Sequence, residues 1–155
     1  MFIPFLFEPS FGLVNAERSI VTAIGSWENE ITVTNPADIG KVTAEIALRH
    51  PGISGVVHVS GDTISMRRLA DVVEQSTAKA VVRKLKPLAD LMRDLADKPT
   101  DGMCKYRVVF GRGIGVSWPK NESFNAKQGI DTTTVVDWAS QNLAVRRSDA
   151  AKSSG

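Results

Sequence analysis

The sequence predicts an α/β domain with a sheet that is at least partly parallel. Short β-branched and aliphatic runs alternate with amphipathic helical segments from about residue 30 to residue 97, and this alternation is typical of parallel strands joined by helical crossovers. Capping residues and prolines mark the expected starts of several helices. With 155 residues, 43% hydrophobic and 23% charged, the chain is large enough for one hydrophobic core.

Four strands are expected, because short runs rich in β-branched residues are bounded by turn-forming residues. The first occupies residues 19–27 together with the turn that follows it. The others are predicted at residues 31–34, 56–59 and 80–85. Gly61 and Asp62 are expected to close the third strand.

The first long helix has a clear start signal. Asn35 can cap free backbone N–H groups, and Asp38 three residues later completes a pair that resembles a capping box. Ile39, Val42 and Ile46 follow at helical spacing and give one apolar stripe. The helix is expected to end at His50, before Pro51 and Gly52.

Three further helices are predicted from caps and helical spacing. Ser65 is the expected cap of one helix, Pro87 begins another, and Asp131 or Thr132 caps the last. Their inward faces are expected to be Leu69, Val72 and Val73; Leu88, Leu91, Met92 and Leu95; and Val135, Trp138, Ala139 and Leu143. Residues 103–110 fit either a strand or a helical face made of Met103, Tyr106 and Phe110.

The glycines of the Gly111–Gly115 segment resemble a phosphate-binding loop only superficially. A dinucleotide site needs G-x-G-x-x-G between a strand and a helix, so that the helix N-terminus faces the pyrophosphate. Here Val116 stands where the third glycine belongs, and Pro119 follows too soon for a helix to begin. A glycine-rich turn is the better interpretation.

Other catalytic signatures are missing from the sequence. The only tyrosine, Tyr106, has Phe110 four residues later, so there is no Tyr-x-x-x-Lys pair, and no G-x-S-x-G elbow is present. His50 and His58 lack the spacing of zinc ligands. His50 is expected to complement a helix C-terminus, and His58 to be partly buried in a strand. Cys104 is expected to be a core or boundary thiol.

The formal net charge of +2 lies entirely in the last dozen residues. The rest of the chain is neutral, which argues against a nucleic-acid or membrane-surface role. Residues 144–155 are expected to form a disordered basic tail, separate from a region at 1–143. One cysteine excludes an internal disulfide and favours a reducing compartment, so a cytoplasmic location, or a nuclear one, is expected.

The N-terminal stretch is rich in aromatic residues, namely Phe2, Phe5, Phe7, Phe11 and Trp27. These residues could line a substrate pocket, because ligand sites are mostly apolar and aromatic, or they could belong to an ordinary core. The apolar opening at residues 1–7 lacks the basic start of a signal peptide and is far shorter than a membrane span. It is expected to be a core-bound segment that begins abruptly.

Several segments between about residue 5 and residue 143 resemble the NmrA-like family, which includes isoflavone-reductase-like oxidoreductases and is abundant in fungi. The segments are Phe5–Gly12, Ala23–Trp27, Ile31–Gly40, Val57–Ser65 with Leu69–Asp71, Lys105–Phe110, Trp118, Phe124–Asn125 and Gly129–Ile130. They resemble the middle and C-terminal portion of family members. The resemblance therefore implies the substrate-side portion of a Rossmann-type fold, without the N-terminal nucleotide-binding half.

The resemblance assigns no catalytic, cofactor-binding or metal-binding residue to this chain. In the family, the glycine-rich loop for NAD(P) and a catalytic lysine lie upstream of the matching region. The family segment that corresponds to Phe5–Gly12 runs beside the substrate cleft, so Phe5, Phe7, Phe11 and Gly12 are the expected pocket residues. The family also places residues 103–110 in a helix, so the resemblance predicts a helix over these residues.

Three interpretations of function remain. The chain can be an inactive fragment of an NAD(P)-dependent oxidoreductase that acts on a small molecule. It can instead be a non-catalytic regulatory protein that binds a protein partner, or the product of a truncated gene model. Without the missing half, the strands at 31–34 and 56–59 would lose their partners, so marginal stability and self-association are expected.

Overall fold

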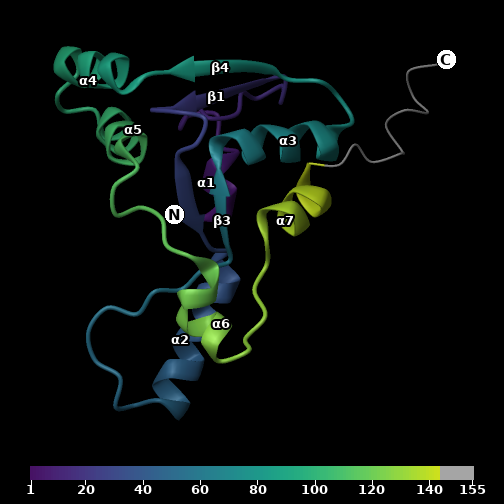
Figure 1. The fold of residues 1–155 in the computed structure, drawn as a ribbon, viewed down its shortest axis with the longest axis vertical. Coiled ribbons are helices and arrows are strands. Elements are labelled where there is room, and N and C mark those ends of the chain that lie inside the picture. Colours follow the sequence, from purple (N-terminus) through teal and green to yellow (C-terminus); the bar gives the residue numbers. More distant parts are fainter. Residues whose placement is uncertain (144–155) are drawn as a thin grey trace.

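The computed structural model describes residues 1–143 and shows an α/β fold (Figure 1). The predicted tail at residues 144–155 lies outside the described residues. The elements in order are α1 (Ile3–Leu6), β1 (Ile20–Ile24), β2 (Glu30–Val33), α2 (Pro36–Arg49), β3 (Asp62–Ser65), α3 (Met66–Thr77), β4 (Val82–Lys86), α4 (Leu88–Asp97), α5 (Gly102–Arg112), η1 (Lys120–Glu122), α6 (Phe124–Lys127) and α7 (Val135–Asn142). Within the described residues, no helix is long and apolar enough to cross a membrane.

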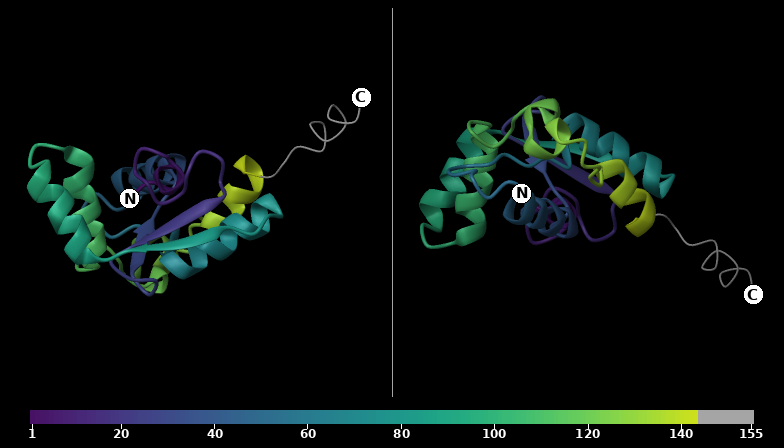
Figure 2. Two further views of the ribbon diagram at one scale, coloured as in Figure 1. Left: turned by 90° about the horizontal axis from the view of Figure 1, so that it is seen from above. Right: turned by 90° about the horizontal axis from the view of Figure 1, so that it is seen from below.

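Strands β1 and β4 form a parallel pair in which Ile20 lies opposite Val82 and Ile24 opposite Lys86. Figure 2 shows the two strands side by side, with α3 running along one face. Leu69, Val72 and Val73 of α3 are buried, as their spacing predicts. The other edge of β1 is covered by the preceding chain, because Thr22 N–H donates to the Leu13 carbonyl (2.8 Å).

The second pair of strands corrects the prediction for residues 56–59. These residues form no strand, and Val56 is 86% exposed. The partner of β2 is instead β3, which begins three residues later and pairs antiparallel, with Thr32 opposite Thr63. Met1 and Phe2 occupy the opposite edge of β2, where Phe2 forms a parallel bridge with Thr34. The prediction that the strands pair only partly in parallel is therefore right, because β1 and β4 are parallel and β2 and β3 are antiparallel.

The predicted helix starts differ in how their caps are made. Ser65 caps α3 as expected, because its Oγ accepts a hydrogen bond from the Arg68 N–H. Asn35 precedes α2 but makes no side-chain cap, and the Asp38 carboxylate accepts from the backbone N–H of Thr133 (2.8 Å). The predicted capping pair at α2 is wrong, because both side chains contact a distant segment instead.

The cap of the last helix is also different from the prediction. Neither Asp131 nor Thr132 caps α7; Thr134 does, in a reciprocal capping box with Asp137. The Thr132 hydroxyl donates instead to the backbone carbonyl of Ser60 (3.1 Å). A Thr-x-x-Asp pattern was present in the sequence, but the choice among adjacent polar residues needed the fold.

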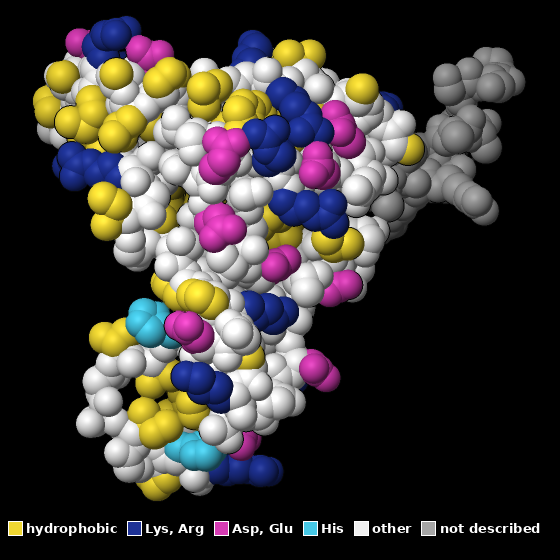
Figure 3. All heavy atoms as spheres, viewed as in Figure 1, with side chains coloured by type: hydrophobic (Ala, Val, Ile, Leu, Met, Phe, Trp, Pro, Cys, Tyr) yellow, Lys and Arg dark blue, Asp and Glu magenta, His cyan; other side chains and the backbone are white. Residues whose placement is uncertain are grey.

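The molecule divides into a body and a lobe. The body contains β1, β4, α1, α3, α4, α5 and α7 around a continuous apolar core, with β2 and β3 leading toward the lobe. The lobe comprises α2, the segment 50–61, η1 and α6. Figure 3 shows it as a protrusion that carries both histidines, His50 and His58. The expectation that His58 is partly buried is wrong, since its side chain is exposed beside Trp118.

Candidate functional site

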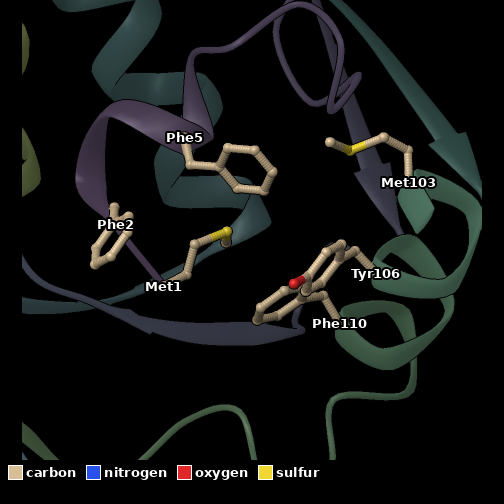
Figure 4. A pocket seen from close by; sticks show the side chains of 6 residues that line it. All are labelled: Met1, Phe2, Phe5, Met103, Tyr106 and Phe110. Carbon is tan, nitrogen blue, oxygen red and sulfur yellow. The ribbon is translucent and has the colours of Figure 1, made fainter.

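An apolar pocket of about 350 Å³ lies between α1 and α5 (Figure 4). Its lining consists of Met1, Phe2, Phe5, Met103, Tyr106 and Phe110. This volume is at the small end of the range found for small-molecule sites, about 300–1,000 Å³. Phenyl rings and thioethers dominate the surface, and such groups favour a neutral, flat ligand.

The N-terminal wall follows from the short helix α1. Ile3 and Leu6 are completely buried on the inner side of α1, whereas Phe5 between them is only partly buried. Phe2 and Phe5 are three residues apart and therefore share the face that borders the pocket. The Phe5 ring is stacked on Phe11, with ring centroids 4.7 Å apart and an interplanar angle of 28°.

The opposite wall is one face of α5. Cys104, Val108 and Gly111 are buried on the inner side of the helix, in agreement with the expectation that Cys104 is a core or boundary thiol. Met103, Tyr106 and Phe110 follow at helical spacing and border the pocket. The helical assignment of this segment is confirmed, and the strand alternative is wrong because α5 runs without interruption from residue 102 to residue 112.

The start of α5 is fixed by Asp101. Its carboxylate accepts hydrogen bonds from the N–H groups of Met103 (2.7 Å) and Cys104 (3.2 Å). These backbone hydrogen bonds, led by the one from Cys104, hold the pKa of Asp101 below its usual value. The cap determines where the first pocket residue of α5, Met103, stands.

Arg107 connects α5 to the turn that follows α1. From α5 its guanidinium donates to the backbone carbonyls of Phe11 and Ser10, each at 2.7 Å. Gly12 follows with a φ of +88°, and a Cβ at this position would lie 3.5 Å from the Arg107 guanidinium. The positive charge of Arg107 therefore faces the turn at residues 10–12, and Arg107 is not among the residues that line the pocket.

The four expected pocket residues occupy four different places. Phe5 lines the pocket. Phe11 is fully buried behind it, in contact with Phe5 and, edge to face, with Phe110 (5.9 Å, 86°). Phe7 faces α7 and stacks on Trp138 (4.9 Å, 12°). Gly12 is exposed beside Arg107.

Sequence reasoning missed the contribution of α5 to this pocket. Met103, Tyr106 and Phe110 were recognised as one helical face, but nothing local indicates what that face meets. The signal was the presence of two aromatic residues and a methionine on a helix whose inner face was already supplied by Cys104 and Val108.

The glycine-rich segment does not fit a dinucleotide. Gly111 lies inside α5, and Gly113 ends the helix in the left-handed conformation, with a φ of +66°. The segment therefore presents a helix C-terminus, whereas a pyrophosphate requires the N–H groups of an N-terminus. Its role is close packing: the Gly111 carbonyl accepts from Asn29 Nδ2 (2.8 Å), and a Cβ on Gly25 would lie 2.0 Å from that carbonyl oxygen.

Residues 1–143 contain no group of three or more potential metal ligands. His50 forms the C-terminal end of α2, as predicted, and its ring meets Phe124 edge to face (5.3 Å, 88°). His58 lies against the Trp118 ring, with centroids 4.6 Å apart. The two histidines therefore each pair with an aromatic ring.

The pocket and its surrounding fold have known relatives. The chain is 37% identical over 136 residues to an NmrA-like family domain-containing oxidoreductase of Gibberella moniliformis, a match that covers 86% of this chain and 44% of the relative. The chain is related to the NmrA-like family. The resemblance seen in the sequence is thus confirmed, and the chain spans about half the length of the relatives it matches. No protein-family profile matches it.

Solved structures show the same fold at low sequence identity. An isoflavone reductase matches with a TM-score of 0.71 and 14% identity, over 90% of this chain and 49% of its own. The NADPH-dependent quinone oxidoreductase QOR2 of Escherichia coli matches with a TM-score of 0.67 and 15% identity, over 92% of this chain and 52% of its own. The chain therefore has the architecture of about half of these proteins.

Proposed function

We propose that this chain is the C-terminal, substrate-side half of an NmrA-like NAD(P)-dependent oxidoreductase and is inactive alone. The observation that carries the proposal is the apolar pocket between α1 and α5, which is lined by residues of this chain. In the same chain, the one glycine-rich segment lies at the wrong end of a helix to hold a dinucleotide.

The pocket suits a neutral, flat organic substrate. Phe5 and Phe110 offer ring faces, and the thioethers of Met1 and Met103 adapt to a range of shapes. Of the residues expected beside the cleft, Phe5 contacts the substrate in this proposal. Phe7, Phe11 and Gly12 support it from behind or from the neighbouring turn.

The remaining parts of the reaction belong to the other half of the protein in this proposal. The relative is an oxidoreductase more than twice the length of the matched region, and a QOR2 structure is described as complexed with NADPH. A nucleotide-binding half would supply NAD(P) and the catalytic lysine. A cytoplasmic or nuclear location is part of the same proposal.

A chimera tests the proposal. The part of the Gibberella relative that this chain does not match would be fused upstream of Met1, and NADPH and NADH binding would be measured by nucleotide fluorescence and thermal shift. We expect no binding by the 155-residue chain at millimolar nucleotide and binding by the chimera. We also expect the chimera to oxidise NADPH with small aromatic ketones or quinones.

Three results would contradict parts of the proposal. Tight one-to-one binding of NADPH by the isolated chain would show that it carries its own dinucleotide site. A folded chimera that binds NADPH without transferring hydride would favour the regulatory alternative. Phe5→Lys should block the apolar pocket. If the chimera with this substitution turns over as fast as the chimera without it, the pocket takes no part in the reaction.

Self-association of the isolated chain remains a prediction. The edge expected to be uncovered at residues 31–34 is not, because β2 lies between β3 and the Met1–Phe2 segment. Among the described residues, β4 pairs only with β1, so its other edge has no strand partner, and its exposed side chains include Val82 (58%) and Leu85 (49%). Sedimentation velocity of the purified chain would measure it. A single monomeric species with cooperative two-state unfolding would contradict the expectation.

A further inference from the structure

Tyr106 brings the one polar side-chain group into the lining of the apolar pocket. The other five lining side chains end in phenyl rings or thioethers. Its side chain is 54% exposed, and its hydroxyl makes no hydrogen bond to any residue in the range 1–143. Figure 4 shows this hydroxyl on the pocket side of the ring. A free phenol donor at an apolar surface is available to a ligand.

The hydroxyl is held at a defined place. The Tyr106 ring stands edge-on to Phe5, with centroids 6.5 Å apart and an interplanar angle of 74°. Helix α5 behind it is fixed by the Asp101 cap and by Arg107, which is bonded to the turn at residues 10–12. A tyrosine has only two side-chain torsions, so positioning its hydroxyl costs little conformational entropy.

The side chains that line the pocket offer no partner to a charged ligand. No lysine, arginine, aspartate or glutamate lines the pocket. The nearest guanidinium on α5, that of Arg107, already donates to the Phe11 and Ser10 carbonyls. The one charged group at the lining is the N-terminal ammonium of Met1, which donates to the Thr32 carbonyl (3.0 Å) and whose pKa is lowered by burial. A cation in this pocket would therefore lose its hydration without gaining a partner, and an anion would find no other positive group.

We infer that the Tyr106 hydroxyl selects neutral aromatic ligands that carry an oxygen acceptor, such as a ring ketone, over hydrocarbons of the same shape. The ring of the ligand contacts Phe5 and Phe110, while the phenol donates a hydrogen bond to the carbonyl oxygen. This inference rests on the proposed function, because it assigns the substrate class of the same pocket.

The test compares 1-tetralone with tetralin, two neutral ligands that differ mainly in the carbonyl group. Binding to the full chain would be followed by NMR of 13C-labelled methionine methyl groups. The chain has four methionines: Met1 and Met103 line the pocket, while Met66 is buried in the core and Met92 lies outside the lining. Met66 and Met92 therefore report on folding and on non-specific binding in the same spectrum.

We expect 1-tetralone to bind the wild-type chain about fivefold more tightly than tetralin, the value of one ordinary hydrogen bond. Tyr106→Phe should reduce this preference to about one and leave tetralin binding unchanged. Phe5→Ala should weaken both ligands together. Val109→Ala, which alters an equally exposed residue of α5 (50%) outside the lining, should change neither.

Two results would overturn the inference, and they can be told apart. If both ligands move the Met103 signal but Tyr106→Phe leaves their ratio unchanged, Tyr106 does not select the ligand and the apolar pocket stands. If neither ligand moves Met103 up to its solubility limit, while Met66 shows a folded core, the pocket binds no such ligand. The proposed function then fails as well.

Discussion

The body and the lobe of this chain are stabilised by different forces. The body has a continuous apolar core that includes Phe11, Val21 and Leu69, each at most 1% exposed. In the lobe, α2 has a single fully buried side chain, Val42, and it lies outside that core. Ile39 and Ile46, which complete the predicted stripe, are only half-buried.

Directional polar contacts take the place of a core in the lobe. The Asn125 side chain accepts from the Ser60 N–H and donates to the Ser60 carbonyl, both at 2.9 Å, and so pairs with the segment 50–61 as a neighbouring strand would. Asp38 accepts from Thr133 N–H, and Lys41 donates to the Asp131 carbonyl (3.0 Å). The comparison teaches that burial of apolar side chains stabilises the body, whereas a few hydrogen bonds determine where the segment 50–61 of the lobe lies.

The largest effect is expected in the body. Phe11→Ala removes a fully buried ring that touches both Phe5 and Phe110, so it should cost about 3–5 kcal/mol of unfolding free energy. Urea denaturation followed by circular dichroism would measure the loss. Phe2→Ala is the matched control, because Phe2 is 54% exposed and should change stability by less than about 1 kcal/mol. Equal losses in the two variants would contradict the apolar account of the body.

The lobe should respond locally to the loss of its central amide. Asn125→Ala leaves both backbone groups of Ser60 without this partner, at an expected cost of about 2–3 kcal/mol. Hydrogen exchange measured by mass spectrometry should become faster in residues 50–61 while β1 and α3 stay protected. Asn121→Ala, at an exposed position of η1, is the control. Uniformly faster exchange would show that the lobe and the body unfold as one unit.

The pocket lies within the body, but it depends on hydrogen bonds as the lobe does, namely those from Arg107 to the Phe11 and Ser10 carbonyls. Arg107→Met keeps the aliphatic stem and removes the donors to Phe11 and Ser10, with an expected loss of about 1–2 kcal/mol. Both tetralin and 1-tetralone should bind more weakly, because α5 is no longer held to the turn at residues 10–12 that follows α1. Arg93→Met, which breaks only an exposed ion pair with Asp90, should have little effect. Unchanged ligand binding in Arg107→Met would show that the hydrogen bonds of Arg107 to Phe11 and Ser10 do not maintain the pocket.

The smallest effect is expected from pH at the α5 cap. The pKa of Asp101 is lowered in the folded chain by hydrogen bonds from Cys104 and Met103. Its contribution to stability is therefore complete above the ordinary aspartate pKa, about 4, and is lost as the pH falls below it. Asp101→Asn keeps a good capping side chain and should flatten this part of the pH dependence of thermal unfolding between pH 5 and pH 2.5. If the unfolding temperature of Asp101→Asn depends on pH as steeply as that of the wild-type chain, other carboxylates cause the loss of stability in acid.

The elements themselves were largely predictable because their signals are local. Ser65 is followed by apolar residues at helical spacing, and both the cap and the inward face of α3 agree with the prediction. Strands at 19–27, 31–34 and 80–85 were also expected; β2 and β4 lie within two residues of the predicted bounds, and β1 ends three residues earlier than predicted. Capping and amphipathic spacing act over three or four residues, so the sequence alone expresses them.

The partners of those elements were not predictable in the same way. Residues 56–59 are as β-branched as β2, but they lie beside Asn125 and α6 without a strand partner, while Asp62–Ser65 pairs with β2. Asn35 and Asp38 have the chemistry of a cap, yet Asp38 bonds a segment 95 residues away. A polar side chain bonds whichever backbone group reaches it first, and only the tertiary structure decides which one that is.

The candidate site shows the same division. The sequence by itself determined that the N-terminal segment is aromatic, that residues 103–110 can form a helix with one face of Met103, Tyr106 and Phe110, and that Gly111–Gly115 is no phosphate loop. Only the tertiary structure brought that helical face opposite Phe5, buried Phe11 behind it and turned Phe7 toward Trp138. The physical reason is that a helix fixes which residues share a face, whereas the surface which that face meets depends on contacts about 100 residues apart, such as Arg107 with Phe11.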